Sequence, residues 1–282
     1  MTGTWAVETR RRSAGKPTGL IITADDFGLD PAVNEAVERA YTGGVLNATS
    51  LMVSSPAAAD AVARAKRMPG LAVGLHLVLA DGHATLPASR IPDLVGPDGR
   101  FGDHMARDGA KFFLLPHVRR QLAAEIEAQF AAFSATGLKL DHVNAHKHFH
   151  IHPTILSLIL DIGKDFGVQA VRLPAEPGME WWLAPWVNLM RRRLDRAGVA
   201  HNDHIFGISE SGAMDEQALL SALERLPAGL TEIYGHPATH GGLTPTMTDY
   251  RHSDELAALM SPRVRGVVDD LGLAHGGFSA LV

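Results

Sequence analysis

GLIITADDFGLDP, residues 19–31, is the stretch from which we predict the fold. Its first six residues form an apolar run of the kind found in strands that are buried on both faces. The turn DDFGLD follows, and Asp30 and Pro31 are then residue types preferred as a helix N-cap and as the first helical residue. The stretch therefore predicts a buried strand, a turn and a helix, in that order.

The same succession of strand, turn and helix recurs along the rest of the chain. The expected strands cover residues 19–24, 48–53, 71–79, 138–149, 170–173, 205–208 and 230–234. No linker-like stretch divides this run of units, which favours one parallel α/β barrel, complete or incomplete, over an open sheet. In such a barrel the functional residues lie at the C-terminal ends of the strands.

Two segments interrupt the alternation, and the N-terminus stands outside it. Residues 81–117 contain several Gly and Pro without a clear period, and the Trp-rich residues 174–200 separate two of the strands. We treat both as insertions in a single domain, 19–282. Residues 1–18 are predicted to be a flexible basic leader, with contact to an anionic membrane as the alternative. They lack the apolar segment of a secretory signal, so we expect a cytoplasmic protein.

The composition excludes several classes of protein and of site. The 282 residues include no Cys, which excludes disulfides, zinc-thiolate sites, iron–sulfur ligation and Cys nucleophiles. Any metal must therefore be held by His, Asp, Glu and water. No apolar run reaches the length of a membrane span, and the net charge of −5 argues against a nucleic-acid partner.

Two adjacent carboxylates, Asp25 and Asp26, directly follow the first expected strand. Burying them is costly unless something uses them, so one is a candidate metal ligand and the other a candidate base. A helix-capping turn is the alternative. His76, within the third strand, alternates with apolar residues and is a candidate ligand, although a lone His in a strand can also be an ordinary core residue.

The fourth expected strand is unusually rich in His. It reads LDHVNAHKHFHIHP, with His142, His146, His148, His150 and His152 at alternate positions. In an extended strand these five side chains share one face, so His146 and His148 would enter the same cavity. Five His cannot all bind one ion, and a surface His-rich tract is the alternative.

Other candidates lie after later strands. His236, in YGHPATH, is placed to protonate a leaving amine, or is simply a turn residue before Pro237. Arg172 is a candidate for orienting a substrate oxygen, with a surface salt bridge as the alternative. Trp181 and Trp182 begin a segment that ends in a run of Arg, which fits either a lid that meets lipid or a bulky apolar substrate, or a packed helix.

Together, these motifs resemble the YdjC/ChbG family of carbohydrate deacetylases. The motifs are TADDFGL, GLHL, DHVNAHKHFHIHP and GHPA, and the similarity runs in order from about residue 19 to 275. Within the family, NAHKHFHIHPTI resembles the hopanoid-biosynthesis branch, HpnK. Where the family often has Asp-Ser before the first His of this motif, the chain has Asn144-Ala145, which weakens any role carried over from that Asp.

The resemblance implies a distorted TIM-like (β/α) barrel that hydrolyses the N-acetyl group of an amino sugar. It implies one divalent metal ion, held by Asp26, His76 and His146, with Asp25 as general base and His236 as general acid. The hopanoid branch implies a lipid-linked substrate, N-acetylglucosaminyl bacteriohopanetetrol, and with it peripheral contact with the inner membrane. We expect His148, His150, Arg172, Trp181 and Trp182 to contact the substrate.

Several points stay open at this stage. Mg²⁺ and Zn²⁺ both suit the ligand types, and a homodimer and a monomer are both compatible with the sequence. A chitooligosaccharide deacetylase, a metal-dependent phosphoesterase, a two-carboxylate glycosidase and a non-catalytic sugar- or lipid-binding protein are the competing functions. The glycosidase fits poorly, because adjacent Asp25 and Asp26 point in opposite directions in an extended turn.

Overall fold

The computed structural model describes residues 16–179 and 181–282. Residues 1–15 of the expected leader lie outside the described residues. The boundary that we predicted for the leader is too late, because Pro17 and Thr18 already belong to the first strand, β1 (Pro17–Phe27). Their backbone is held by pairing with a neighbouring strand, beginning at Pro17 opposite Gly229.

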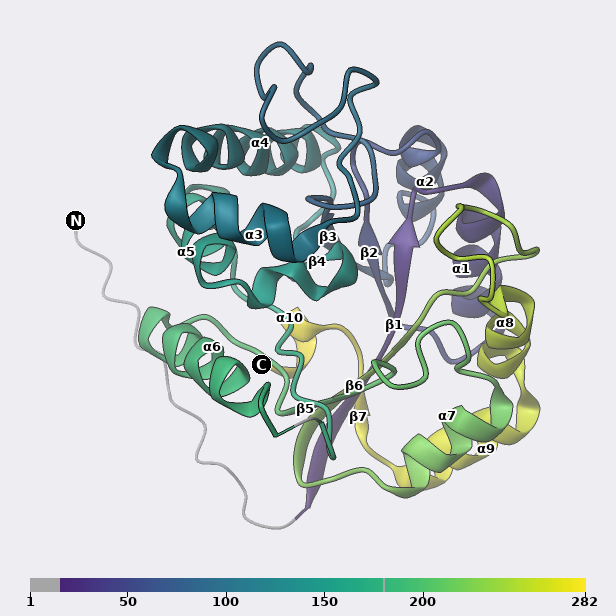
Figure 1. Ribbon diagram of the computed structural model, residues 1–282. Coiled ribbons are helices and arrows are strands. Elements are labelled where there is room, and N and C mark those ends of the chain that lie inside the picture. The colour runs from purple at the N-terminus through teal and green to yellow at the C-terminus, as the bar shows by residue number, and fades with distance from the viewer. Residues whose placement is uncertain (1–15, 180) are drawn as a thin grey trace, which may run out of the picture.

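A curled, wholly parallel sheet forms the centre of the molecule (Figure 1). Besides β1, its strands are β2 (Ala48–Leu51), β3 (Ala72–Leu77), β4 (Val143–Ala145), β5 (His204–Phe206), β6 (Gly229–Gly235) and β7 (Ala274–His275). The order across the sheet is β4-β3-β2-β1-β6-β5, with β7 paired to β1. This confirms the predicted distorted TIM-like barrel with parallel strands.

The gap between β4 and β5 is spanned by a segment that forms no regular strand. Residues 170–173, predicted as the fifth strand, make only two isolated parallel bridges, Val143 with Val171 and Ala170 with Ala200. Beyond them, the Asn202 side chain bonds to both backbone groups of Leu173, at 2.7 Å each. A side chain thus replaces part of the ladder, and the barrel is distorted there.

Helices cover the outer surface of the sheet, except for α10 (Phe278–Leu281), which lies within its curve. They are α1 (Pro31–Gly43), α2 (Ala58–Ala65), α3 (Met105–Leu114), α4 (Pro116–Ala135), α5 (Pro153–Gly163), α6 (Ala184–Ala197), α7 (Glu216–Glu224), α8 (His252–Met260), α9 (Pro262–Leu271) and α10, with two short 3₁₀ segments, η1 (His146–Ile151) and η2 (Lys164–Phe166). The start of α1 is as predicted, since the Asp30 carboxylate accepts a hydrogen bond from Ala32 N at 2.7 Å.

One prediction about a helical region needs correction. The region 81–117 is not irregular throughout, because it contains all of α3. Near the C-terminus, α8 and α9 are separate helices, because the Ser261 hydroxyl caps α9 and Pro262 begins it. Among the described residues, no helix is both long and apolar enough to cross a membrane.

The N-terminal end of the barrel is closed by α10. Its Phe278 is fully buried and belongs to a small apolar cluster inside the barrel, with Ile21, Ala48, Ala170 and Leu230. The helix lies within the curve of the sheet (Figure 1) and is held by Asp141, whose carboxylate accepts hydrogen bonds from Phe278 N at 3.0 Å and Ser279 N at 2.9 Å. With this end closed, the opposite end of the strands is left for the site.

Asp141 caps the N-terminus of α10, and removing its carboxylate is expected to lower the stability of the protein. Asp141→Ala leaves two backbone N–H groups without their acceptor, so we expect a loss of about 2 kcal/mol in the free energy of unfolding. Burial would raise the pKa of Asp141, but the bonds to His142 and Ser279 hold it well below its usual range. The stabilisation is therefore present above about pH 4 and shrinks as the pH falls below it.

Urea denaturation at pH 7 and at low pH measures this loss. Asp161→Ala is the matched control, since Asp161 is an exposed carboxylate paired with Lys164 on the surface. A loss for Asp141→Ala no larger than that for Asp161→Ala would contradict the role of the cap.

Candidate metal centre and active site

Side chains able to do chemistry gather at the C-terminal ends of the strands. Asp25 and Asp26 lie near the end of β1, and His76 lies near the end of β3. His146 and His236 directly follow β4 and β6. Because all these strands run parallel, their ends meet at one mouth of the barrel.

Asp26 owes its position to an irregularity in β1. The pairing register with β2 shifts between Ala24 and Phe27, and Asp26 has a positive φ of 64°. Such left-handed backbone is unusual outside Gly and re-aims a side chain that regular alternation would point away. The expectation that Asp25 and Asp26 point in opposite directions is therefore wrong, since both carboxylates reach the surroundings of His76.

Three side chains bring their ligand atoms together at this point. Asp26 Oδ1 lies 3.2 Å from His76 Nε2 and 3.1 Å from His146 Nδ1, and the two His nitrogens are 3.4 Å apart. All three residues are buried, and they are the only group of three such side chains with metal-ligand spacing among the described residues.

These distances suit a divalent cation. An ion about 2.0–2.2 Å from each of three donors leaves the donors about 3.0–3.5 Å apart, which is the spacing observed here. Asp26 Oδ2 is buried without a hydrogen-bond partner, so the carboxylate is only partly satisfied by the protein. One carboxylate and two imidazoles are ligands shared by several divalent ions, and the triad therefore fits a metal without selecting one.

The orientation of His76 is set by Asn144 and Ser50. His76 Nδ1 donates to Asn144 Oδ1 at 2.8 Å, which leaves Nε2 with a lone pair that faces Asp26 and His146. The Asn144 amide in turn donates to Asp25 Oδ1 at 3.1 Å, and the Ser50 hydroxyl donates to the same oxygen at 2.7 Å. Asn144 thus links a candidate ligand to the candidate base.

Arg172 holds the Asp25 carboxylate in place through an ion pair inside the barrel. Its guanidinium donates to Asp25 Oδ2 at 2.5 Å and Oδ1 at 2.9 Å, and also to both oxygens of Glu232. Arg172 and Glu232 have no exposed surface. Burial alone would raise the pKa of Asp25, but the Arg172 guanidinium holds that pKa far below its usual range, so the carboxyl is ionised at neutral pH.

The His-rich stretch does not form the long strand that we predicted. Strand β4 ends at Ala145, and the chain turns into η1, where Lys147 and His148 have positive φ values of 55° and 54°. Strand alternation therefore stops at His146. The prediction that five His side chains share one face is wrong, because two successive left-handed residues send each following side chain in a new direction.

The other four His of the stretch have separate surroundings. His148 Nε2 is 2.8 Å from the Tyr234 hydroxyl, whereas His150 donates to the Arg172 carbonyl at 3.0 Å. Burial and the Arg172 charge lower the pKa of His150 to about 3, so it is neutral. His142 pairs with Asp141 at the other end of the barrel, and His152 caps α5.

A cavity of about 60 Å³ opens above the triad. Its walls come from the strand ends, from η1 and from the loops after β5 and β6; they are Asp25, His76, Ala145, His146, Lys147, His148, Ser211, Tyr234, His236, Thr246, Met247 and Tyr250. The His236 ring lies between Tyr234 and Tyr250, at 5.5 and 5.2 Å between ring centres, and its Nδ1 is buried without a partner. The candidate acid, the candidate base and two of the three candidate ligands, His76 and His146, therefore share one cavity.

Comparison with known proteins places the chain in a family. Residues 19–270 match the family described as YdjC-like protein, which is most of the chain. The chain belongs to the YdjC-like family. This confirms the family predicted from the sequence motifs.

Two curated relatives of this YdjC-like protein cover nearly its whole length. A carbohydrate deacetylase of Brevibacillus brevis is 30% identical over 270 residues, which are 93% of this chain and 99% of that protein. A chitooligosaccharide deacetylase of Serratia marcescens is 31% identical over 265 residues, covering 93% and 98%. A solved structure from Enterococcus faecalis has a TM-score of 0.76 at 22% identity, over 95% of this chain and 100% of that one, which shows the shared fold.

The residues predicted to contact substrate divide into three groups. His148 lines the cavity, and its contact with substrate stays a prediction. His150 and Arg172 have no exposed surface and lie beneath it, so we correct their role from substrate contact to support of Asp25 and its surroundings. Trp181 and Trp182 do not line the cavity and are exposed at the surface, just before the start of α6.

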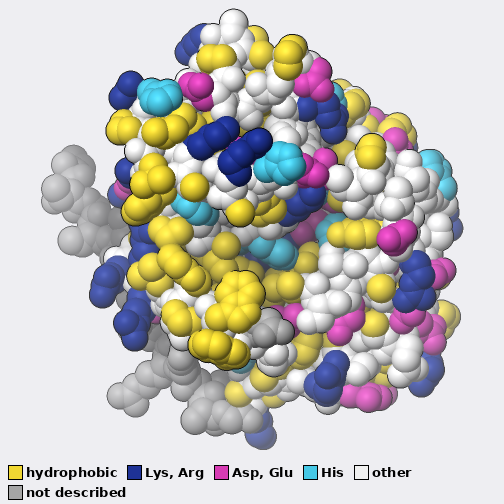
Figure 2. Space-filling view, in the orientation of Figure 1, with side chains coloured by type: hydrophobic (Ala, Val, Ile, Leu, Met, Phe, Trp, Pro, Cys, Tyr) yellow, Lys and Arg dark blue, Asp and Glu magenta, His cyan; other side chains and the backbone are white. Residues whose placement is uncertain are grey.

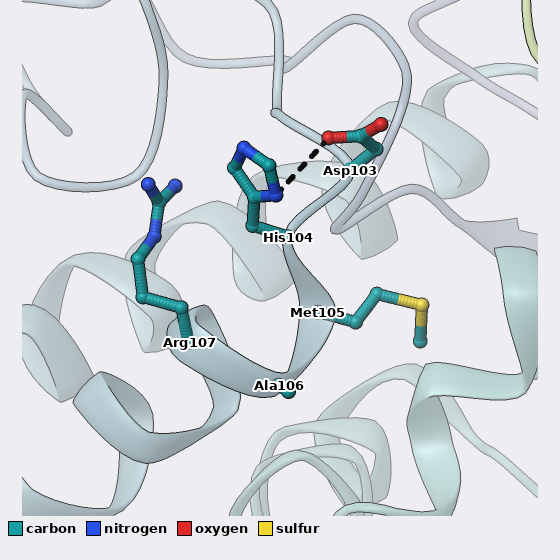
Figure 3. Close-up of a pocket in the computed structure, with 5 residues that line it drawn as sticks. All are labelled: Asp103, His104, Met105, Ala106 and Arg107. Carbon is teal, nitrogen blue, oxygen red and sulfur yellow. Dashed lines mark ion pairs between the residues drawn. The ribbon is translucent and has the colours of Figure 1, made fainter.

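A second hollow, of about 610 Å³, lies at the start of α3 (Figure 3). It is lined by the five consecutive residues 103–107, of which His104 pairs with Asp103 at 3.5 Å. Both of these side chains are well exposed. The hollow contains none of the triad, Asp25 or His236, so it is a surface depression rather than the reaction site of the YdjC-like protein.

Asp81 joins three loops around the mouth of the cavity. Its carboxylate pairs with Lys147 Nζ at 2.8 Å and accepts a hydrogen bond from the Thr246 hydroxyl. Asp81 itself has a positive φ of 48°, as does Lys147 at 55°. Backbone strain of this kind persists only where surrounding contacts hold it, and it is often found at functional sites. Lys147 and Thr246 both line the cavity.

Asp81→Asn is expected to loosen this junction without unfolding the protein. Losing the charge-assisted bond to Lys147 misplaces two cavity walls, so we expect about a tenfold loss in kcat/KM for acetate release. Metal content and melting temperature should change little. Asp98→Asn, an exposed carboxylate in the same insertion, is the control. Equal kinetics for both variants would show that the junction has no role in catalysis.

Sequence reasoning missed several polar residues inside the barrel. These are Ser50, Asn144 as a functional residue, Glu232 and Tyr234. The available signal was alternation: Ser50 is a polar residue inside an apolar strand, and Glu232 and Tyr234, both on β6, are four and two residues before His236. Residues at this spacing in a strand share one face, which here is the interior of the barrel.

Proposed function

We propose that the chain is a metal-dependent carbohydrate deacetylase, which hydrolyses the N-acetyl group of an amino sugar. The observation that carries the proposal is that the Asp26, His76 and His146 triad lies beside the same cavity as Asp25 and His236. The two relatives described as carbohydrate and chitooligosaccharide deacetylases support the substrate class. Mg²⁺ and Zn²⁺ both remain compatible with the triad.

Asp26, His76 and His146 would hold the metal. A divalent cation there would polarise an amide carbonyl and make water a better nucleophile at neutral pH. Asp25 is held ionised by Arg172, and its Oδ2 accepts only one hydrogen bond, so it can take a proton from a water molecule in the cavity. Ser50 and Asn144 fix the orientation of that carboxylate through Oδ1.

His236 completes the proton balance. Hydrolysis forms a C–O bond from water and breaks the C–N bond of the amide, and the departing nitrogen needs a proton. His236 lies on the cavity wall, where its imidazole can give a proton to the departing amine. The water's proton goes to Asp25 and the amine's comes from His236, so the products are acetate and a free amino sugar.

For the natural substrate, we propose a lipid-linked amino sugar. The resemblance of NAHKHFHIHPTI to the hopanoid branch supports N-acetylglucosaminyl bacteriohopanetetrol, and such a substrate would bring the enzyme into peripheral contact with a membrane. Chitooligosaccharides are the second candidate, supported by the Serratia marcescens relative.

Acetate release tests the proposal. The purified, metal-replete protein is incubated with an N-acetylglucosaminyl lipid and with chitobiose, each with and without a chelator. We expect acetate from at least one substrate, and its loss with the chelator. No acetate from either substrate would refute the deacetylase function, and a preference for chitobiose would refute the lipid-linked substrate alone.

A phosphoesterase is less well supported by the site. Such enzymes commonly use two ions about 3.5–4 Å apart, bridged by carboxylates. Among the described residues only one ligand group is present, and it contains a single carboxylate. Phosphate release from a sugar phosphate, without acetate release from either acetylated substrate, would favour the phosphoesterase over the deacetylase.

A further inference from the structure

We propose that a surface formed by the α3–α4 corner and the start of α6 docks on an anionic lipid bilayer. We call it the docking surface and define it by seven side chains: Phe113, Leu114, Leu115, Trp181, Trp182, Trp186 and Leu189. The inference rests on the proposed function in one respect, because it names the surface on which a lipid-linked substrate would be met.

Exposure of large apolar side chains is concentrated on this surface. Among the described residues, eight large hydrophobic side chains are strongly exposed, and all but Val282 belong to the docking surface. Trp181 is 83% exposed, and Phe113 and Leu114 are 68% exposed each. Scattered exposed apolar residues are ordinary, but a contiguous group of this kind marks an interaction site.

Helix α6 is apolar on two sides. Val187, Met190 and Leu194 are buried and attach the helix to the protein. Trp186 and Leu189, three residues apart, are exposed and form a second apolar stripe. A helix needs only one such face to pack, so the outer stripe has no partner within the described part of the protein.

The two halves of the docking surface are fixed to two successive elements, the start of α5 and η1. On α6, Arg193 donates to the Pro153 carbonyl at 2.9 Å, at the start of α5. On α3, Phe112 packs against Phe149 of η1, with ring centres 5.6 Å apart. Figure 1 places α3 and α6 on the same side of the barrel, and Figure 2 shows hydrophobic side chains as a band across both. Because η1 also carries His146 and His148, the docking surface borders the active-site turn.

The charge around the docking surface favours an anionic partner. Residues 111–120 and 181–196 contain seven Lys or Arg and one Asp, although the whole chain has a net charge of −5. Arg119, Arg120, Arg192 and Arg196 are exposed. Apolar side chains bordered by cations match the interface of an anionic bilayer, where acyl chains lie beneath negative head groups.

The same charge argues against a second copy of the chain as the occupant. A two-fold dimer places the same patch of each subunit face to face. It would therefore bring the two basic segments together, and like charges at an interface are unfavourable. A membrane provides the opposite charge.

Intrinsic fluorescence reads this surface directly, because Trp181, Trp182 and Trp186 are three of the four Trp in the chain. We expect the emission to shift to shorter wavelength with vesicles of phosphatidylcholine and phosphatidylglycerol, and much less with phosphatidylcholine alone. Co-sedimentation with the same vesicles gives the partition constant. Neither measurement depends on turnover, so a failed deacetylase assay would leave the result standing.

Variants separate the apolar and charged contributions. Trp181→Ser/Trp182→Ser should weaken binding to anionic vesicles at least tenfold, and Arg192→Gln/Arg196→Gln should weaken it by about fivefold for each charge. Arg39→Gln/Arg263→Gln, which removes two exposed charges outside the docking surface, is the control and should bind as the unchanged protein does. Thermal melting confirms that each variant is folded.

Three results would overturn the inference. The first is no binding of the full chain to anionic vesicles. The second is binding that Trp181→Ser/Trp182→Ser leaves unchanged. The third is a dimer in sedimentation equilibrium that this double variant dissociates, because the surface would then be occupied by a second copy of the chain.

Discussion

His146→Ala is expected to lower acetate release at least about 10³-fold and to remove the bound metal. His146 supplies one of the three ligand atoms, and the metal's charge stabilisation is worth several kcal/mol in hydrolases of this type, of which about 4 kcal/mol corresponds to 10³ in rate. Metal content by elemental analysis and acetate release are measured on the same preparations. The fold should survive, because η1 lies outside the sheet.

His148→Ala is the matched control for this prediction. The two residues lie in the same turn and both line the cavity, but His148 bonds to Tyr234 rather than to the triad. We expect His148→Ala to keep its metal and to lose activity only through substrate binding or positioning. Undiminished metal content in His146→Ala would show that the triad is not the metal site.

Arg172→Met is expected to have the largest effect on stability. The substitution leaves two carboxylates, Asp25 and Glu232, in the interior of the barrel without their common cation. Breaking a buried ion pair by removing one partner costs about 3–5 kcal/mol, because the remaining charge is not compensated. Chemical denaturation at neutral pH measures the loss, and activity should fall with it because Asp25 is no longer held in place.

The double variant Arg172→Met/Glu232→Gln distinguishes charge from packing. Replacing Glu232 with a neutral isostere removes one of the two uncompensated charges, so we expect it to restore part of the lost stability but not the activity. If the single and double variants are equally unstable, the cost comes from the shape of the Arg172 side chain rather than from its charge.

The roles of the two mutated residues, His146 and Arg172, differ in how far they could be predicted from the sequence. His146 and His76 follow or end apolar strands, and parallel strands bring such ends together. The family resemblance of the motifs implied their meeting with Asp26. Arg172 could be identified as a candidate functional residue, but its ion pairs could not be predicted. Its partners, Asp25 and Glu232, are 147 and 60 residues away, and no local pattern encodes that pairing.

The His-rich stretch shows where local reasoning ends. Alternation predicted one shared face for five His, but Lys147 and His148 adopt left-handed backbone and end the strand at Ala145. Nothing in the residue types announces this turn, since neither is Gly. The contacts that stabilise it are nonlocal, such as the ion pair of Lys147 with Asp81.

The resemblance of the chain's motifs to the YdjC/ChbG family supplied the three candidate ligands Asp26, His76 and His146. By itself, the sequence determined the α/β barrel and the ends of its strands as the place of the site. It could do so because apolar runs and helix caps are local signals and parallel strands leave one geometry for their ends. Only the tertiary structure decided that Asp25 rests on Arg172 and that Trp181 lies on the surface, away from the cavity. Burial and long-range hydrogen bonds depend on which segments pack together, and that is a property of the folded chain.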